Sequence, residues 1–118
     1  MENKPSLPTL ALLLCLSILS SCQSRPPSFN FGAYSEAERF YEQGRYEKAI
    51  EKYQAYLREN PEGNMAAIAS YSMAKSYEAL GKLDQARPLY QKIIKEYSHL
   101  PWADFSKSRL KELDSRSE

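Results

Sequence analysis

The sequence predicts an all-α protein made of two similar helix hairpins followed by a C-terminal capping helix. One observation is an internal repeat: when Gly44 is laid on Gly81, an offset of 37 residues, small and aromatic residues coincide along both copies. The other is the spacing of apolar residues within each copy, which recur three and four positions apart, as on one face of an α-helix.

Each copy is predicted to be an antiparallel pair of helices, repeat 1 over about 34–61 and repeat 2 over about 67–98. A glycine stands between the two helices of each copy, where it can adopt the left-handed conformation that ends a helix and reverses the chain. The pairs that coincide are Tyr34 with Tyr71, Ala37 with Ala74, Phe40 with Tyr77, Tyr46 with Leu83, Ala49 with Ala86 and Tyr53 with Tyr90.

Capping residues and prolines predict where the helices start. Ser35 and Glu38 have the S-x-x-E spacing of a capping box, which places the first start near Ser35. Pro88 falls just past the first turn of the later helix of repeat 2, so we expect a small kink rather than a break.

A fifth helix is predicted over about 101–113, with Pro101 at its first position. It is either a cap over the open end of the stack or the first helix of an absent third repeat. Residues 115–118 are polar and are expected to fray. The apolar residues that mark this helix are Trp102, Phe105, Leu110 and Leu113, and we expect the first three to cover the open end.

The N-terminus is predicted to be a signal peptide, residues 1–21. The uncharged run Leu10–Leu19 is about half the ~20 residues that a membrane-spanning helix needs. The tetrapeptide Leu19-Ser20-Ser21-Cys22 that follows resembles a bacterial lipobox. The resemblance implies that cleavage precedes Cys22, that Cys22 carries diacylglycerol, and that its new amine is acylated, as by palmitate. The alternative is an ordinary secretory signal, although Leu19 stands where that cleavage requires a small residue.

Residues 22–33 are predicted to be the lipidated cysteine and a flexible tether. Two prolines, two serines and a glycine, without a helical period, are typical of a linker. In Gram-negative lipoproteins an Asp after the lipidated Cys commonly retains the protein in the inner membrane. Gln23 stands at that position, so the resemblance favours a periplasm-facing anchor in the outer membrane.

The charge balance and the residue inventory exclude several function classes. With 16 Lys and Arg against 15 Asp and Glu, the net charge of +1 argues against a nucleic-acid binder. The single histidine, His99, is expected at the surface, and no base, nucleophile and orienting group can be assembled for catalysis. No metal-ligand spacing and no phosphate-binding loop is present, so we expect neither a cofactor nor an enzyme.

The repeat resembles the tetratricopeptide (TPR) family. The matching residues are Ala37, Phe40, Gly44, Tyr46, Ala49, Tyr53 and Pro61, then Ala74, Tyr77, Gly81, Leu83, Ala86 and Tyr90. The resemblance covers about 34–113, nearly all of the predicted domain 34–114, and implies a right-handed α-solenoid. Its 37-residue period exceeds the family's 34, and the second closing proline is displaced to Pro101. This longer unit is similar to the repeats of an envelope group that includes the lipoprotein BamD and the periplasmic protein CpoB.

The TPR resemblance also implies a partner groove on the first helix of each repeat. The inner-face positions are Tyr34, Glu38 and Tyr41 in the first copy and Tyr71, Lys75 and Glu78 in the second. Amphipathic aromatic and charged residues suit a protein or peptide partner. The alternative is that the two tyrosines pack within the stack and that Glu38 and Lys75 form a weak surface pair.

These observations predict a lipid-anchored scaffold that binds a protein partner at the bacterial envelope, in outer-membrane assembly, secretion or a Tol-type complex. One alternative is a pilotin-like escort of a secretin. Another is a structural lipoprotein that self-associates, because two repeats fall short of the roughly three that a solenoid usually needs.

Overall fold

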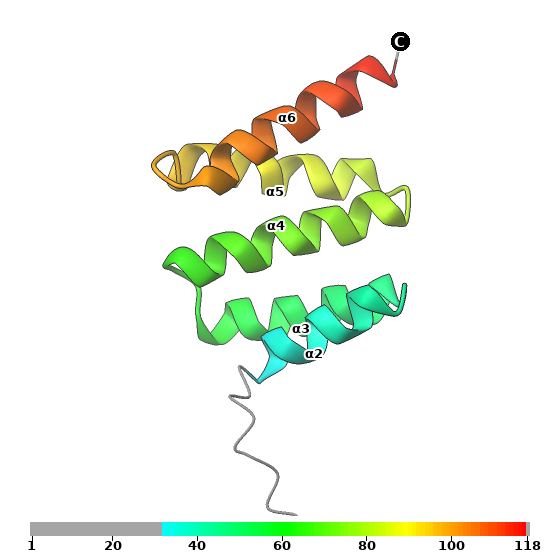
Figure 1. The fold of residues 1–118 in the computed structure, drawn as a ribbon, viewed down its shortest axis with the longest axis vertical. Helices are drawn as coiled ribbons and strands as arrows, with labels where there is room; N and C mark the ends of the chain where they lie inside the picture. Colours follow the sequence, from blue (N-terminus) through cyan, green and yellow to red (C-terminus); the bar gives the residue numbers. More distant parts are fainter. Residues whose placement is uncertain (1–31, 118) are drawn as a thin grey trace, which may run out of the picture. The chain divides into compact units, whose positions relative to one another are not determined.

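The computed structural model describes residues 32–117, which form five helices and contain no strand (Figure 1). Within this range the prediction of an all-α fold is confirmed. The predicted signal peptide, Cys22 and nearly all of the tether lie outside the described residues. The helices are α2 (Ala33–Glu42), α3 (Tyr46–Glu59), α4 (Asn64–Ala79), α5 (Leu83–Glu96) and α6 (Pro101–Ser115).

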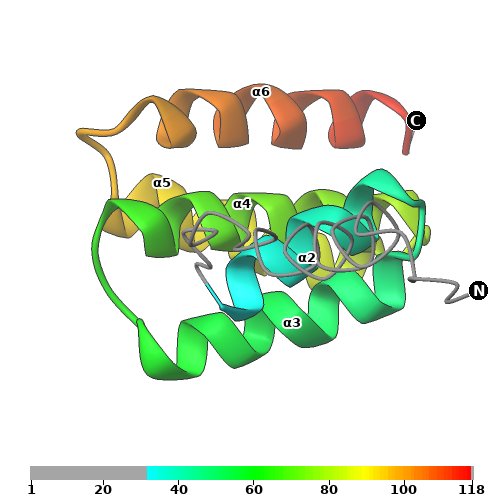
Figure 2. The ribbon, with the colours of Figure 1, turned by 60° about the horizontal axis from the view of Figure 1, so that its bottom comes forward.

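The helices stack in chain order as two hairpins and a final single helix. α2 pairs with α3 and α4 pairs with α5, while α3 packs on α4 and α5 packs on α6. Helices α2, α4 and α6 lie on the nearer side in Figure 1, and α3 and α5 lie behind them; Figure 2 shows the same stack from below. We call the side formed by α2, α4 and α6 the inner face.

The glycine turns take the predicted conformation in both hairpins. The φ angles of Gly44 and Gly81 are 71° and 73°, in the left-handed region that other residues rarely adopt. After each glycine the chain reverses through the same backbone bond: the Arg45 N–H donates to the Phe40 carbonyl and the Lys82 N–H to the Tyr77 carbonyl, both at 2.9 Å. The predicted role of these glycines in ending the first helix of each repeat is confirmed.

The predicted capping box at Ser35 is wrong. Helix α2 begins at Ala33, Gly32 is its N-cap with a φ of 54°, and no side chain caps the helix. Ser35 therefore lies inside the first turn. The reason is that the helix already starts after Gly32, so the Ser35 side chain is not at the N-cap, and Glu38 accepts a hydrogen bond from the Tyr53 hydroxyl. Helix α4 likewise starts at Asn64, three residues before the predicted beginning of repeat 2.

The core contains many alanines and one fully buried tyrosine in each hairpin, beside a few larger aliphatic residues. Ala37, Ala49 and Tyr53 are inaccessible to solvent in the first hairpin, and Ala74, Ala86 and Tyr90 in the second. The alanines allow the helices to approach closely, and the tyrosine rings fill the remaining space. Helix α5 continues from Leu83 to Glu96 with Pro88 inside it, so Pro88 does not break the helix, as predicted.

Helix α6 occupies the position of the first helix of a third repeat but has the surface of a cap. It starts 37 residues after α4, and it packs on α5 as α4 packs on α3. The buried residues Ala67, Ser70 and Ala74 of α4 are replaced at this offset by exposed, charged residues. A further helix would have to bury those charges, so α6 closes the stack with a polar outer surface. These three residues of α6 are Asp104, Lys107 and Lys111.

Candidate functional site

The six predicted groove residues all lie on α2 and α4, the first helices of the two hairpins. Of these, the structure brings Tyr41 and Lys75 together across the two hairpins, because the Lys75 Nζ lies 5.7 Å from the centroid of the Tyr41 ring. That distance is within the range of a cation–π contact. The weak pair that we considered between Glu38 and Lys75 is not among the ion pairs of residues 32–117.

The two predicted acidic residues bind buried tyrosines of their own hairpins. The Tyr53 hydroxyl donates to Glu38, and the Tyr90 hydroxyl donates to Glu78 Oε1 at 2.6 Å. The tyrosines are equivalent in the repeat, but the carboxylates are not, since Lys75 is the equivalent of Glu38. Both acidic groups thus complete the packing of the core. Burial and these carboxylates raise the pKa of both tyrosines above the ordinary value.

Glu78 also joins the capping helix to the second hairpin. Arg109 of α6 donates through Nε to Glu78 Oε1 at 3.2 Å and through Nη2 to Glu78 Oε2. The Glu78 side chain is 9% exposed and the Arg109 side chain 25% exposed. Burial alone would raise the pKa of Glu78, but the hydrogen bonds from Arg109 and Tyr90 lower it below the ordinary value. We call this set the Glu78 network.

Tyr34 and Tyr71 pack on the buried tyrosines rather than standing free. Their ring centroids lie 6.0 Å from Tyr53 and 5.7 Å from Tyr90, in edge-on geometry in both hairpins. Tyr34 also contacts Tyr56 at 5.5 Å. Burial, followed by the neighbouring Glu38 carboxylate, raises the pKa of Tyr34 to about 12. Substitution of either residue would therefore disturb the core as well as the surface.

The inner face carries an aromatic cluster where α4 meets α6, formed by Tyr71, Trp102 and Phe105. The Tyr71 ring lies 5.2 Å from Trp102 and 6.2 Å from Phe105, and the last two are 5.6 Å apart. Phe105 is 50% exposed and is the only large hydrophobic residue so exposed within the described range. Our expectation that Phe105 covers the end of the stack is wrong: Ser106, the next residue, is buried there and Phe105 turns outward.

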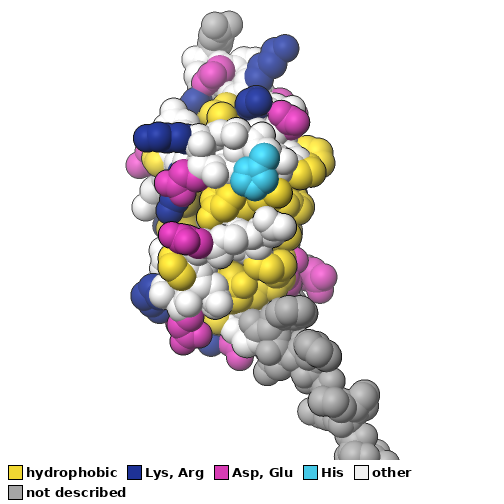
Figure 3. Space-filling model, turned by 90° about the vertical axis from the view of Figure 1, so that its left-hand side faces the viewer, with side chains coloured by type: hydrophobic (Ala, Val, Ile, Leu, Met, Phe, Trp, Pro, Cys, Tyr) yellow, Lys and Arg dark blue, Asp and Glu magenta, His cyan; other side chains and the backbone are white. Residues whose placement is uncertain are grey.

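The described residues enclose an open hollow at one end of the hairpins. The hollow has a volume of about 370 Å³ and lies at the α3–α4 and α5–α6 loops. His99 is exposed as predicted, and Figure 3 shows it on the surface of this side of the molecule. The hollow is lined by Glu62, Gly63, Asn64, Glu96, Tyr97 and His99. In residues 32–117 no cluster of His, Cys, Asp and Glu suits a metal ion, and no helix could span a membrane.

Comparison with known families decides the class of the chain. The family model described as Tetratricopeptide repeat matches residues 34–101, more than half of the 118-residue chain. This chain is a tetratricopeptide repeat protein. TPR proteins typically act as non-enzymatic scaffolds for protein–protein interaction, which makes a protein the expected class of ligand. No curated protein and no solved structure matches the chain.

Three features of the TPR domain were missed from sequence. The aromatic cluster was missed because Trp102 and Phe105 were assigned to the cap. The Glu78 network was missed because its members lie in three helices, and the repeat offset aligns Arg109 with Ser72, a residue of different chemistry. A cluster of three cations around the Phe40 ring was missed because these residues, Arg39, Arg45 and Lys48, follow no regular spacing in the chain.

Proposed function

We propose that this TPR protein is a lipid-anchored scaffold that holds a protein partner at the bacterial outer membrane, facing the periplasm. The partner binds the inner face, with the aromatic cluster as its main contact. The lipid on Cys22 keeps the domain at the membrane, and residues 23–31 separate the domain from the lipid. The chain itself performs no chemistry in this account.

The half-exposed Phe105 is the observation that supports partner binding most directly. Elsewhere in the described range large hydrophobic side chains are at least partly buried, and the other exposed residues of α6 are mostly charged or polar. Aromatic residues are enriched at the core of protein interfaces, so an exposed ring backed by two more suits the main contact with a partner. Since Trp102 and Tyr71 already hold the ring in place, a partner would not have to order it.

The chemistry of the N-terminal sequence supports the membrane anchor. One acyl chain attaches a protein only marginally, whereas a diacylglycerol cysteine has two chains, and three once its amine is acylated. Cys22 directly follows a short apolar segment and two serines, as a lipobox requires, and Gln23 is not the Asp that favours inner-membrane retention. An assembly or Tol-type complex is the proposed setting, by similarity to the BamD and CpoB group.

Capture of partners from the cells that make this protein tests the binding face. Phe105→Ala should reduce recovery of the partner at least thirtyfold, as expected for loss of a central interface residue worth about 2 kcal/mol. Lys107→Ala, a change at a residue whose side chain is 58% exposed on the same helix, is the matched control and should leave recovery unchanged. Equal recovery by both variants, with native helicity, would place the partner elsewhere.

The anchor is tested separately from the binding face. The mass of the N-terminal peptide of the mature protein should equal that of a peptide starting at lipidated Cys22. Cys22→Ala should prevent this modification and cleavage. An unlipidated mature N-terminus would refute the anchor but would leave the binding face standing. If the captured partner is a secretin, and deletion of this protein mislocalises that secretin, the pilotin-like escort replaces the assembly role. If the captured partner is a second copy of the chain, the self-associating structural lipoprotein replaces it.

A further inference from the structure

Besides the aromatic cluster, the structure has a group of three cations around one aromatic ring. This group lies on the surface of the first hairpin, near the α2–α3 turn. The Arg39 Cζ, Arg45 Cζ and Lys48 Nζ atoms lie 6.0, 4.8 and 5.7 Å from the centroid of the Phe40 ring. The three cationic residues are exposed, whereas Phe40 is half-buried against the core. The ring therefore gathers three positive charges at one place, which we call the basic cluster.

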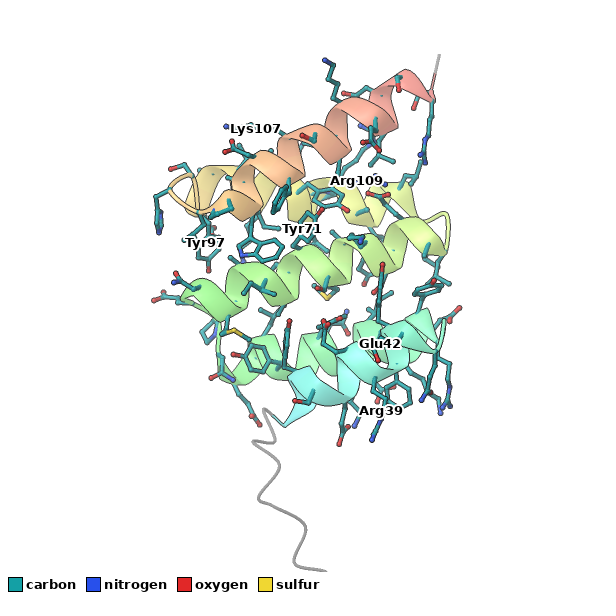
Figure 4. All side chains as sticks on the ribbon, in the orientation of Figure 1. Arg39, Glu42, Tyr71, Tyr97, Lys107 and Arg109 are labelled. Carbon is teal, nitrogen blue, oxygen red and sulfur yellow. The ribbon has the colours of Figure 1, made fainter. Side chains whose placement is uncertain are left out.

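No carboxylate of the described residues forms an ion pair with the basic cluster. The ion pairs found within residues 32–117 do not include Arg39, Arg45 or Lys48. Glu36 is already bound to Lys52 at 2.6 Å. The contact with Lys52 is the main cause that holds the pKa of Glu36 below the ordinary value, and the charge of Arg39 contributes less. Arg39 extends from α2 on the side away from α4, so the second hairpin does not cover it (Figure 4).

The second hairpin shows that the turn does not require these charges. Both turns reverse the chain through the same backbone bond, at the same length of 2.9 Å. At the positions equivalent to the three cations, however, the second hairpin has one cation and two neutral residues. Since the fold is the same with only one of the three charges, the turn does not require the full set, and the basic cluster is a property of the first hairpin alone. The equivalent residues are Ser76, Lys82 and Gln85.

We propose that the basic cluster docks the first hairpin on an anionic lipid surface, with its cations on the headgroup phosphates. Charge complementarity supports this occupant, since guanidinium groups match phosphate geometry and each cation near an anionic membrane strengthens binding roughly fivefold. Three cations together give about a hundredfold. The cluster also lies in the hairpin that follows the tether, with Arg39 only 17 residues after Cys22. The proximity argument rests on the proposed anchor; the charge argument does not.

Hydrogen exchange of the mature chain, reconstituted in vesicles, tests the docking. With vesicles containing about a quarter phosphatidylglycerol, the backbone amides of 39–48 should exchange several times more slowly than with neutral phosphatidylcholine vesicles. The protection should disappear in about half-molar salt, which screens the charges, and in the variant Arg39→Gln/Arg45→Gln/Lys48→Gln. The matched control, Lys82→Gln/Lys95→Gln/Lys111→Gln, removes three exposed cations from α6 and the second hairpin and should keep the protection.

Other outcomes would overturn the docking. Equal protection in neutral vesicles, or protection that survives the triple substitution with native helicity, would show that the charges do not dock the hairpin. Protection by a soluble acidic polypeptide such as polyglutamate, with none from phosphatidylglycerol, would assign the cluster to an acidic protein. The mass of the N-terminal peptide is measured on the same sample. If that peptide carries no lipid, the proposed anchor is wrong but the docking proposal is still open. Sedimentation of the protein with the two kinds of vesicle then tests the basic cluster directly.

Discussion

Replacing Glu78 by Gln should lower the stability of the TPR domain by about 2 kcal/mol. Glu78 is 9% exposed and receives bonds from Arg109 and Tyr90, so the substitution removes a carboxylate that two donors depend on. Removing one member of a fully buried ion pair costs about 3–5 kcal/mol, and an exposed pair contributes about 0–1. Arg109 is 25% exposed and keeps a 2.5 Å contact with Glu112, which places the expected cost between those limits.

Thermal unfolding followed by circular dichroism measures this effect. In a domain of this size, about 2 kcal/mol corresponds to a fall of roughly 10 °C in the midpoint. Because the pKa of Glu78 is lowered in the folded state, its contribution is present above the unfolded value of about 4.5 and is lost as the pH falls through the folded value. The difference between wild type and Glu78→Gln should therefore shrink below about pH 4.5.

The exposed pair between Lys52 and Glu36 provides the control for Glu78. Glu36→Gln removes a carboxylate from a 2.6 Å ion pair of the first hairpin whose partners are both more than a third exposed. Its midpoint should stay at the wild-type value within error, because solvent screens such pairs. If the two Gln variants unfold at the same temperature, the Glu78 network does not hold α6 on the second hairpin.

Three further predictions concern the turns, the buried tyrosines and the cap. Gly81→Ala should cost about 1–2 kcal/mol in urea unfolding: the φ of 73° strains any Cβ although no atom lies within 4 Å, and an unchanged midpoint would contradict this. Because the pKa values of Tyr34 and Tyr90 are raised in the folded state, the stability of the domain should fall as the pH rises above 10. The absorbance of these two tyrosines as tyrosinate should appear at a higher pH than that of exposed tyrosines. If all tyrosines ionise in one step near pH 10 while the helices stay intact, the prediction is refuted. Asp104→Ala/Lys111→Ala should cause concentration-dependent association in sedimentation, whereas a strictly monomeric variant would count against α6 as a polar cap.

The parts of the fold that repeat in the chain were predictable from sequence. The apolar spacing and the two glycines recur at one offset, so each copy supports the interpretation of the other. Helix α6 could be placed because Pro101 marks its start. The start of α2 could not, because Ser35 and Glu38 satisfy the capping pattern, and only the tertiary contact with Tyr53 shows that Glu38 is engaged elsewhere.

The binding surface was less predictable than the fold because its character depends on contacts between helices. The TPR resemblance indicated the inner face and six residues on it, but not that Glu38 and Glu78 bind buried tyrosines. Sequence also marked Trp102 and Phe105 as apolar without showing that Phe105 turns outward. The six groove positions stay a prediction, and we now propose the aromatic cluster of α4 and α6 as the main contact rather than six positions divided between α2 and α4.

The central claim is that this TPR protein acts by holding a protein on its inner face, and photo-crosslinking in living cells tests it most directly. A photoreactive phenylalanine analogue is placed at position 105, and in a second strain at Gln91, which is exposed on α5 at the opposite side of the stack. We predict one dominant cross-linked partner from position 105 and none from Gln91. Cross-links of equal yield from both positions, or none from position 105 in a folded and lipidated protein, would contradict the account.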